Sequence, residues 1–136
     1  MNAKEDLISQ LLSNKIKATG TFIAEENGEK VFSAESVILK KTPDNDYYII
    51  GIHDSKGTQE HIALSVSGVI KDGKYTATPD GAALNWSAEL KGDRSKVKSG
   101  KLSVEFSELR SRARGGYEIT LENNRTLNGE FDISRS

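Results

Sequence analysis

Two histidines, His53 and His61, are the side chains best suited to acid–base or metal chemistry in this sequence. They flank a predicted turn at residues 55–57, so a hairpin could bring them close together. With Asp54 or Glu60 they could form an open metal site, and either imidazole could act as the general base of a hydrolase. Histidines beside a hairpin end are more often solvated polar side chains. We therefore predict no metal site and no catalytic residue.

Carboxylates, cysteines and serines are the other side chains that could take part in catalysis or metal binding. Acidic residues at 25–29 and 44–46 surround asparagine-containing turns, but their spacing matches no dedicated calcium loop. The chain has no cysteine, which excludes disulfides, zinc–thiolate sites and cysteine nucleophiles. No serine lies in a Gly-x-Ser-x-Gly motif. We expect no enzymatic activity and no cofactor.

Three arginines, Arg110, Arg112 and Arg114, recur at every second position. In an extended strand they share one face and could contact phosphate groups or an acidic partner. No aromatic side chains alternate with them to stack on bases, and such rows are typical of a solvated strand edge. An anion-binding surface remains an alternative, and nucleic acid is an improbable partner.

Alternation of apolar and polar residues is the main structural signal, clearest at residues 83–91. Such period-2 patterns predict strands with one buried face. Strands are predicted at 16–25, 30–41, 47–53, 58–70, 74–78, 83–91, around 102–106, 117–121 and 127–133. Turn signals join them, among them Asn27-Gly28 and Asp72-Gly73. The chain therefore reads as one all-β domain over 1–136, an antiparallel meander of 8–9 strands that forms a barrel or a two-sheet sandwich.

Two segments depart from simple alternation. Residues 47–52 are apolar on both faces, which predicts a central strand or one covered by a helix. Residues 3–14 carry an apolar stripe at helical spacing, made by Leu7, Ile8, Leu11 and Leu12. We predict a short N-terminal helix there. It either covers one end of the β structure or binds a partner or a second copy of the chain.

Large apolar residues of the predicted strands could line the interior of a closed barrel. The candidates for contact with a small apolar ligand are Trp86, Leu84, Ile50, Ile62 and Leu64. In a flattened sandwich the same residues would simply fill the core.

Four segments resemble a group of uncharacterised bacterial all-β domains, many of them lipoproteins, whose function is unknown. They are residues 20–24, 73–76, 99–104 and 127–133. The resemblance implies a β-sandwich or barrel and brings no catalytic residue. This sequence lacks the leader and the lipid-attachment cysteine of the lipoprotein members.

The overall charge is close to neutral, with a formal net charge of −1, so it gives no preference for nucleic acid or membrane. The N-terminal residues match no signal peptide, and no run approaches the ~20 apolar residues of a membrane span. A cytoplasmic protein is the default expectation, or an extracytoplasmic one if a leader was removed.

We predict a non-enzymatic binding or interaction module whose contacts come from loops at one end or from the inside of the sheet. Its partner would be an unknown protein or a small apolar molecule, and a homodimer stays open. Two alternatives are kept: a carrier of a small apolar ligand in a lipocalin-like barrel interior, and a hydrolase that uses His53 or His61.

Overall fold

The computed structural model describes residues 18–55, 58–81 and 86–135, and its regular structure is almost entirely strand. The strands are β1 (Ala18–Glu26), β2 (Glu29–Ser33), β3 (Ser36–Lys41), β4 (Tyr47–Ser55), β5 (Thr58–Val66), β6 (Gly73–Ala77), β7 (Ser87–Leu90), β8 (Asp93–Ser107), β9 (Arg112–Leu121) and β10 (Thr126–Arg135). A single 3-10 turn, η1 (Pro79–Gly81), is the described helical element. The predicted helix at 3–14 lies outside the described residues.

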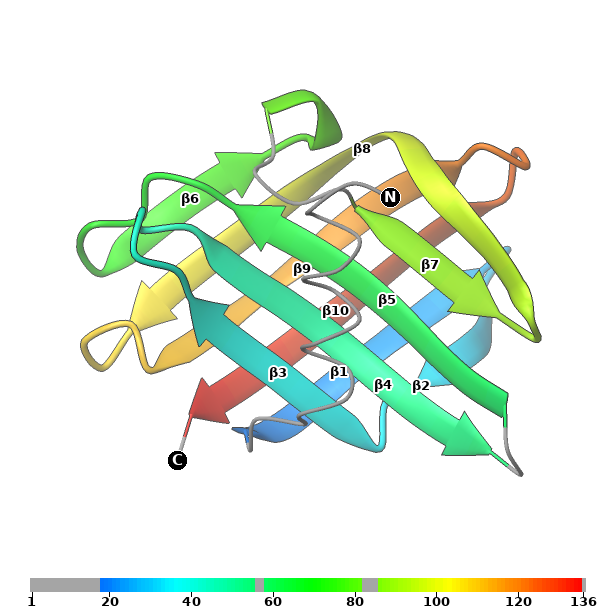
Figure 1. Ribbon diagram of the computed structural model, residues 1–136, viewed down its shortest axis with the longest axis horizontal. Helices are drawn as coiled ribbons and strands as arrows, with labels where there is room; N and C mark the ends of the chain where they lie inside the picture. Colours follow the sequence, from blue (N-terminus) through cyan, green and yellow to red (C-terminus); the bar gives the residue numbers. More distant parts are fainter. Residues whose placement is uncertain (1–17, 56–57, 82–85, 136) are drawn as a thin grey trace.

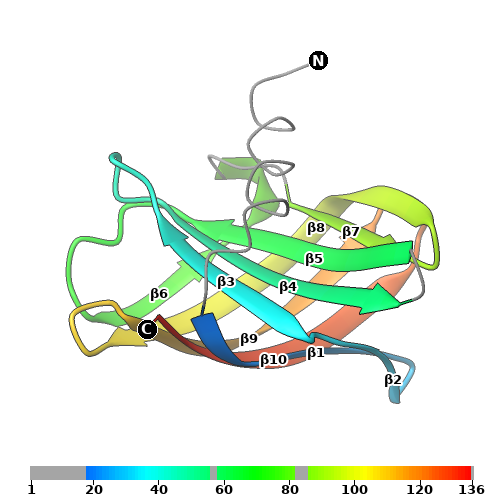
Figure 2. The same cartoon turned by 60° about the horizontal axis from the view of Figure 1, so that its bottom comes forward.

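The sheet closes on itself into an antiparallel barrel (Figures 1 and 2). Its strand order is β10-β9-β8-β7-β5-β4-β3-β1, and β1 pairs with β10 along most of its length. These eight strands form the barrel, while β2 extends from β1 and β6 pairs with β8. The predicted all-β antiparallel meander is confirmed, in its barrel form.

Several predicted strand boundaries were wrong, two of them because the chain changes its pairing partner, and β9 begins at Arg112 rather than near residue 117. The predicted strand 30–41 divides into β2 and β3, since the amide of Ala34 donates to Phe22 and the amide of Glu35 donates to Ile52 on β4. The predicted connection at 92–99 is the first half of β8, which pairs with β7. The predicted strand 58–70 ends at Val66.

Aromatic side chains fill much of the barrel interior. Phe22 packs against Phe32, Tyr117 and Phe131, with ring centroids 5.4–6.1 Å apart. A Cβ atom at Gly51 would come within 2.8 Å of the Phe22 ring, so the glycine on β4 makes room for that ring. The Tyr117 hydroxyl donates to the carbonyl of residue 23 at 2.8 Å, and burial raises the pKa of this phenol.

No helix among the described residues is long and apolar enough to cross a membrane.

Candidate functional site: the loop end of the barrel

Antiparallel pairing gathers the connections at two ends of the barrel (Figure 1). One end, here called the loop end, carries the connections 42–46, 67–72 and 108–111. The opposite end, here called the turn end, carries the connections 27–28, 91–92 and 122–125. The loop end lies on the left of Figure 1 and the turn end on the right.

Two large apolar side chains stand exposed at the loop end. Ile70 is 69% exposed and Leu109 is 78% exposed, and within the described part of the chain no other large hydrophobic side chain is exposed. Scattered apolar side chains on a surface need no explanation. These two are notable because they occupy loops at the same end of the barrel.

The loop that carries Leu109 has an unusual backbone. Glu108, Leu109 and Arg110 have φ angles of 54°, 60° and 62°, so three consecutive non-glycine residues are left-handed. Each such residue costs about 1–2 kcal/mol relative to the right-handed region. A strained conformation of this kind persists only where neighbouring groups hold it, and it is enriched at functional sites.

Asp72, on the neighbouring loop, is the group that holds this backbone. Its carboxylate oxygens accept hydrogen bonds from the amides of Leu109 (3.1 Å) and Arg110 (2.8 Å). The Arg110 guanidinium lies 3.7 Å from the same carboxylate. Asp72 is two residues from Ile70, so these bonds tie the two connections that carry the exposed apolar residues to each other.

Further backbone bonds connect this pair of loops to the rest of the loop end. The amide of Val69, a buried residue, donates to the Asn45 carbonyl at 3.0 Å. The amide of Arg135, at the end of β10, donates to the Ser111 carbonyl at 2.7 Å. The three connections and the last strand thus form one hydrogen-bonded unit.

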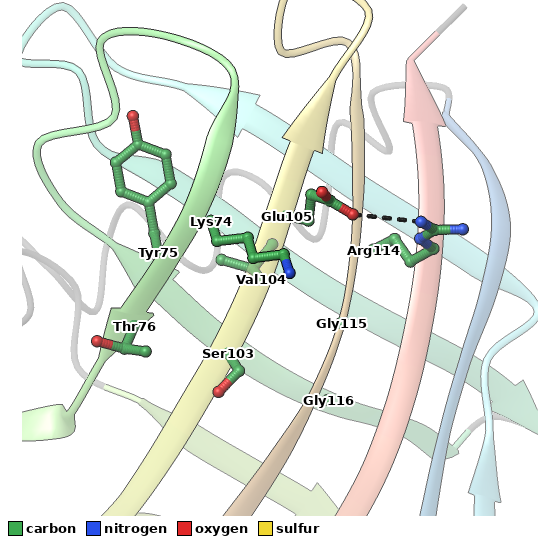
Figure 3. A pocket seen from close by; sticks show the side chains of 9 residues that line it. All are labelled: Lys74, Tyr75, Thr76, Ser103, Val104, Glu105, Arg114, Gly115 and Gly116. Atoms are coloured by element: carbon green, nitrogen blue, oxygen red, sulfur yellow. Dashed lines mark hydrogen bonds and ion pairs between the residues drawn. The ribbon is translucent and has the colours of Figure 1, made fainter.

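A shallow groove adjoins the loop end on the outer side of β6, β8 and β9 (Figure 3). Its volume is about 340 Å³. The register places Lys74, Glu105 and Arg114 in one row across the three strands, and Arg114 lies 3.2 Å from Glu105. Small residues, Ser103 and Gly116, lie beside this row and give the groove its depth.

The hollow continues along the same wall. A second depression of about 400 Å³ shares Ser103 and Gly116 with the groove. Lys101 and Glu118 contribute to its lining. Together, the two depressions form a continuous hollow along β8 and β9 that leads away from the loop end.

The three predicted anion-binding arginines are each matched with a carboxylate. Arg112 makes a two-pronged contact with Asp132, at 3.0 and 2.7 Å. Hydrogen bonding in this pair raises the pKa of Arg112 and lowers the pKa of Asp132. Arg110 lies against Asp72 and Arg114 against Glu105. Anion binding here stays a prediction, but an anion would have to compete with these carboxylates.

The structure does not gather the five predicted ligand-lining residues around one space. Ile62, Leu64 and Trp86 are buried in the interior. The Trp86 indole donates a hydrogen bond to the Ser65 hydroxyl at 3.2 Å. Ile50 is buried on the opposite face of β4, because its neighbour Ile49 points inward. Leu84 lies outside the described residues. Binding of a small apolar ligand in the interior stays a prediction.

The two histidines point to opposite faces of the sheet, since His61 pairs with Ile52 and His53 with Glu60. They cannot share a metal ion, and in the described ranges no group of three or more His, Cys, Asp or Glu could hold one. Burial, and to a smaller extent the positive charge of Arg94, lowers the pKa of His61 to about 4. His53 Nδ1 lies 3.3 Å from a Glu35 carboxylate oxygen, without hydrogen-bond geometry.

Comparison with protein-family models, with curated proteins and with solved structures gave no match for this chain. The resemblance to bacterial all-β domains therefore stays a prediction.

Sequence reasoning missed the residues that define the loop end. Ile70 was assigned to a strand, and Asp72 was identified only as part of a turn. The one local signal was Leu109 itself, an apolar residue between the charged residues Glu108 and Arg110. Nothing local indicated a left-handed backbone there.

Proposed function

We propose that this chain is a non-enzymatic binding module that docks a protein partner on its loop end. The single observation behind the proposal is the pair of exposed side chains, Ile70 and Leu109, on two loops that Asp72 fixes to each other. The groove beside Lys74 and Arg114 would receive the adjoining part of the partner.

Rigid apolar side chains favour protein recognition. A partner that covers Leu109 gains the free energy of apolar burial, about 1.5–3 kcal/mol for one side chain of this size. Ordering a mobile loop would subtract from that gain, and a loop already held by hydrogen bonds avoids much of this cost. A strained, pre-ordered loop therefore fits a docking surface better than a passive connection.

Charges at the loop end argue against two other classes of partner. Nucleic acid would have to displace carboxylates from Arg110, Arg112 and Arg114. An anionic membrane would meet Asp72 and Glu108 beside the exposed leucine. A protein surface with an apolar pocket conflicts with neither feature.

Site-specific photo-crosslinking in the source cells tests the proposal. A benzophenone amino acid is placed at Leu109 in one variant and at Glu122, an exposed residue of the turn end, in the matched control. We expect one discrete protein adduct from position 109 that is absent from position 122. The addition of Asp72→Ala should weaken the adduct, because the loop then loses its fixed conformation.

Three results would overturn the proposal. They are equal adducts from both positions, no adduct from position 109, and exclusive crosslinking of position 109 to lipid or nucleic acid.

A further inference from the structure

The wall made by β3, β4 and β5 is buried on both of its faces. One set of apolar residues points into the interior, including Leu39, Ile49 and Leu64. Five residues on the outer side are equally buried and apolar: Ile38, Tyr48, Ile50, Ile52 and Ala63. His61 and Ser65 are buried on the same side, whereas Lys40 and Asp54, toward the strand ends, are exposed. The register places Ile38, Ile50 and Ala63 in one row across the three strands.

The opposite wall shows what an uncovered outer face looks like. On β8 and β9 the outward positions are polar or small and open to solvent, among them Lys101, Ser103 and Glu118. Alternation of this kind is typical of a sheet with one wet face, whereas strands buried on both faces are apolar throughout. The β3–β5 wall therefore has a cover on its outer side.

None of the described elements provides this cover (Figure 1). The described strands all belong to the one sheet, and η1 packs against β8 on another part of the barrel. Two polar groups of the same side, His61 Nε2 and Ser87 Oγ, are buried with no hydrogen-bond partner among the described residues, which indicates a face closed to water. The described residues alone therefore leave the burial of this face unexplained.

Residues 1–17 are the segment that fits in position and size. Ala18 pairs with Val37 on β3, so the preceding chain starts at the edge of this wall. A helix over residues 3–14 would be about 18 Å long at 1.5 Å per residue. Three strands span roughly 10 Å at their usual spacing. The other undescribed segments, 56–57, 82–85 and 136, are too short to cover three strands.

We propose that residues 3–14 dock as an amphipathic helix on the outer side of β3, β4 and β5. The apolar stripe of Leu7, Ile8, Leu11 and Leu12 then contacts the row of Ile38, Ile50 and Ala63. The helix covers a side wall of the barrel rather than one of its ends. The assignment is independent of the loop end, because it uses none of the residues there.

The absence of native cysteine allows a clean accessibility test in the full chain. Ala63→Cys places one thiol on the outer side of the wall, and Ala113→Cys places one in the interior as a control for global unfolding. With the N-terminal segment unchanged, we expect both thiols to react with a maleimide at least 100-fold more slowly than in urea.

Glutamate substitutions in the predicted helix should then affect the reaction rates of the two thiols differently. Leu7→Glu with Leu11→Glu should speed the reaction of Cys at position 63 at least 10-fold and leave Cys at position 113 protected. Ser9→Glu with Gln10→Glu, on the polar side of the predicted helix, adds the same charge and should change neither rate. If the leucine pair unfolds the chain and exposes position 113 too, the milder Leu11→Ser takes its place with the same expectation.

The proposal fails if the thiol at position 63 stays protected after the leucine substitutions. It also fails if this thiol reacts freely in the otherwise unchanged chain. Protection that falls on dilution would overturn it as well, because the cover would then be a second copy of the chain.

Discussion

The connections at both ends of the barrel reverse the chain between antiparallel strands, but their backbone conformations differ. At the turn end the left-handed positions include Asn27-Gly28 and Lys91-Gly92, with φ angles of 53–82°. Glycine and asparagine tolerate this region at little cost, and Lys91 is the only other residue type among these four. At the loop end, Glu108, Leu109 and Arg110 adopt it without such help. The loop end therefore holds a longer strained segment than the turn end does.

The bonds at the two ends differ in the same sense. Side-chain pairs on the surface dominate the turn end, such as Arg125 with Glu26 at 2.8–2.9 Å and Asn123 with Asp93 at 3.0 Å. At the loop end, Asp72 accepts hydrogen bonds from two consecutive main-chain amides of another loop. At the turn end, Glu60 accepts one such bond, from the Lys91 amide at 2.7 Å. Main-chain bonds of this kind fix a loop's conformation and thereby the direction of its exposed side chains.

Among substitutions of exposed side chains at the two ends, removal of the Asp72 carboxylate should have the largest effect on stability. Asp72→Ala leaves two amides of a strained loop without a charged acceptor, and we expect a loss of about 2 kcal/mol in the free energy of unfolding. Asp93→Ala at the turn end removes one exposed side-chain bond and should cost less than about 0.5 kcal/mol. Urea denaturation measures both, and equal losses would remove the distinction between the ends.

Lowering the pH from 7.5 to 5 should reduce the free energy of unfolding through His61, which lies on β5 in the wall between the two ends. The folded-state pKa of His61 is about 4, below its ordinary value of 6.5, so the unfolded chain binds more protons between these values. Stability is full above pH 6.5 and falls as the pH drops toward 4. For this group the loss between pH 7.5 and 5 is about 2 kcal/mol. Urea denaturation at the two pH values should show this slope in His53→Gln and lose it in His61→Gln; the reverse would contradict the assignment.

Glycine substitution should separate strain from function. Leu109→Gly and Lys91→Gly each relieve one left-handed residue, and each should stabilise the chain by about 1 kcal/mol. Only Leu109→Gly should also weaken partner binding, because it removes the exposed side chain. Thermal denaturation measures the stability of both variants, and the crosslinking assay measures their binding of the partner. A Leu109→Gly variant that binds as well as the parent would show that the Leu109 side chain does not contribute to binding.

The smallest effect is expected at Ile70. Ile70→Ser changes an exposed side chain and should alter the free energy of unfolding by less than about 0.5 kcal/mol. The same change at its buried neighbour, Val69→Ser, should cost about 2–3 kcal/mol. A large loss at Ile70 would mean that this side chain supports the fold rather than a contact.

The sequence predicted the strands well because alternation is a local signal. It predicted the turn at Asn27-Gly28 for the same reason, since these two residue types themselves favour the left-handed conformation of a tight hairpin turn. The run at 47–52 was correctly recognised as apolar on both faces, but that very property hid which face Ile50 occupies.

The candidate site was largely beyond the sequence. The left-handed conformation of Leu109 and Arg110 depends on Asp72, which is 37 and 38 positions away along the chain. The partners of the arginine row are likewise set by strand register: Arg112 meets Asp132 only because β9 and β10 pair as they do. No local pattern carries such information.

The most direct measurement compares the proteins retained from the source-cell extract by three immobilised forms of the chain. The forms are the unmodified chain, the loop-end variant Ile70→Ser/Leu109→Ser and the turn-end control Glu29→Ser/Glu122→Ser. We predict one protein that the first and third forms retain equally and that the loop-end variant retains at least 10-fold less. Equal retention by all three forms, or a loss on the turn-end control instead, would contradict the assignment of the loop end as the docking surface.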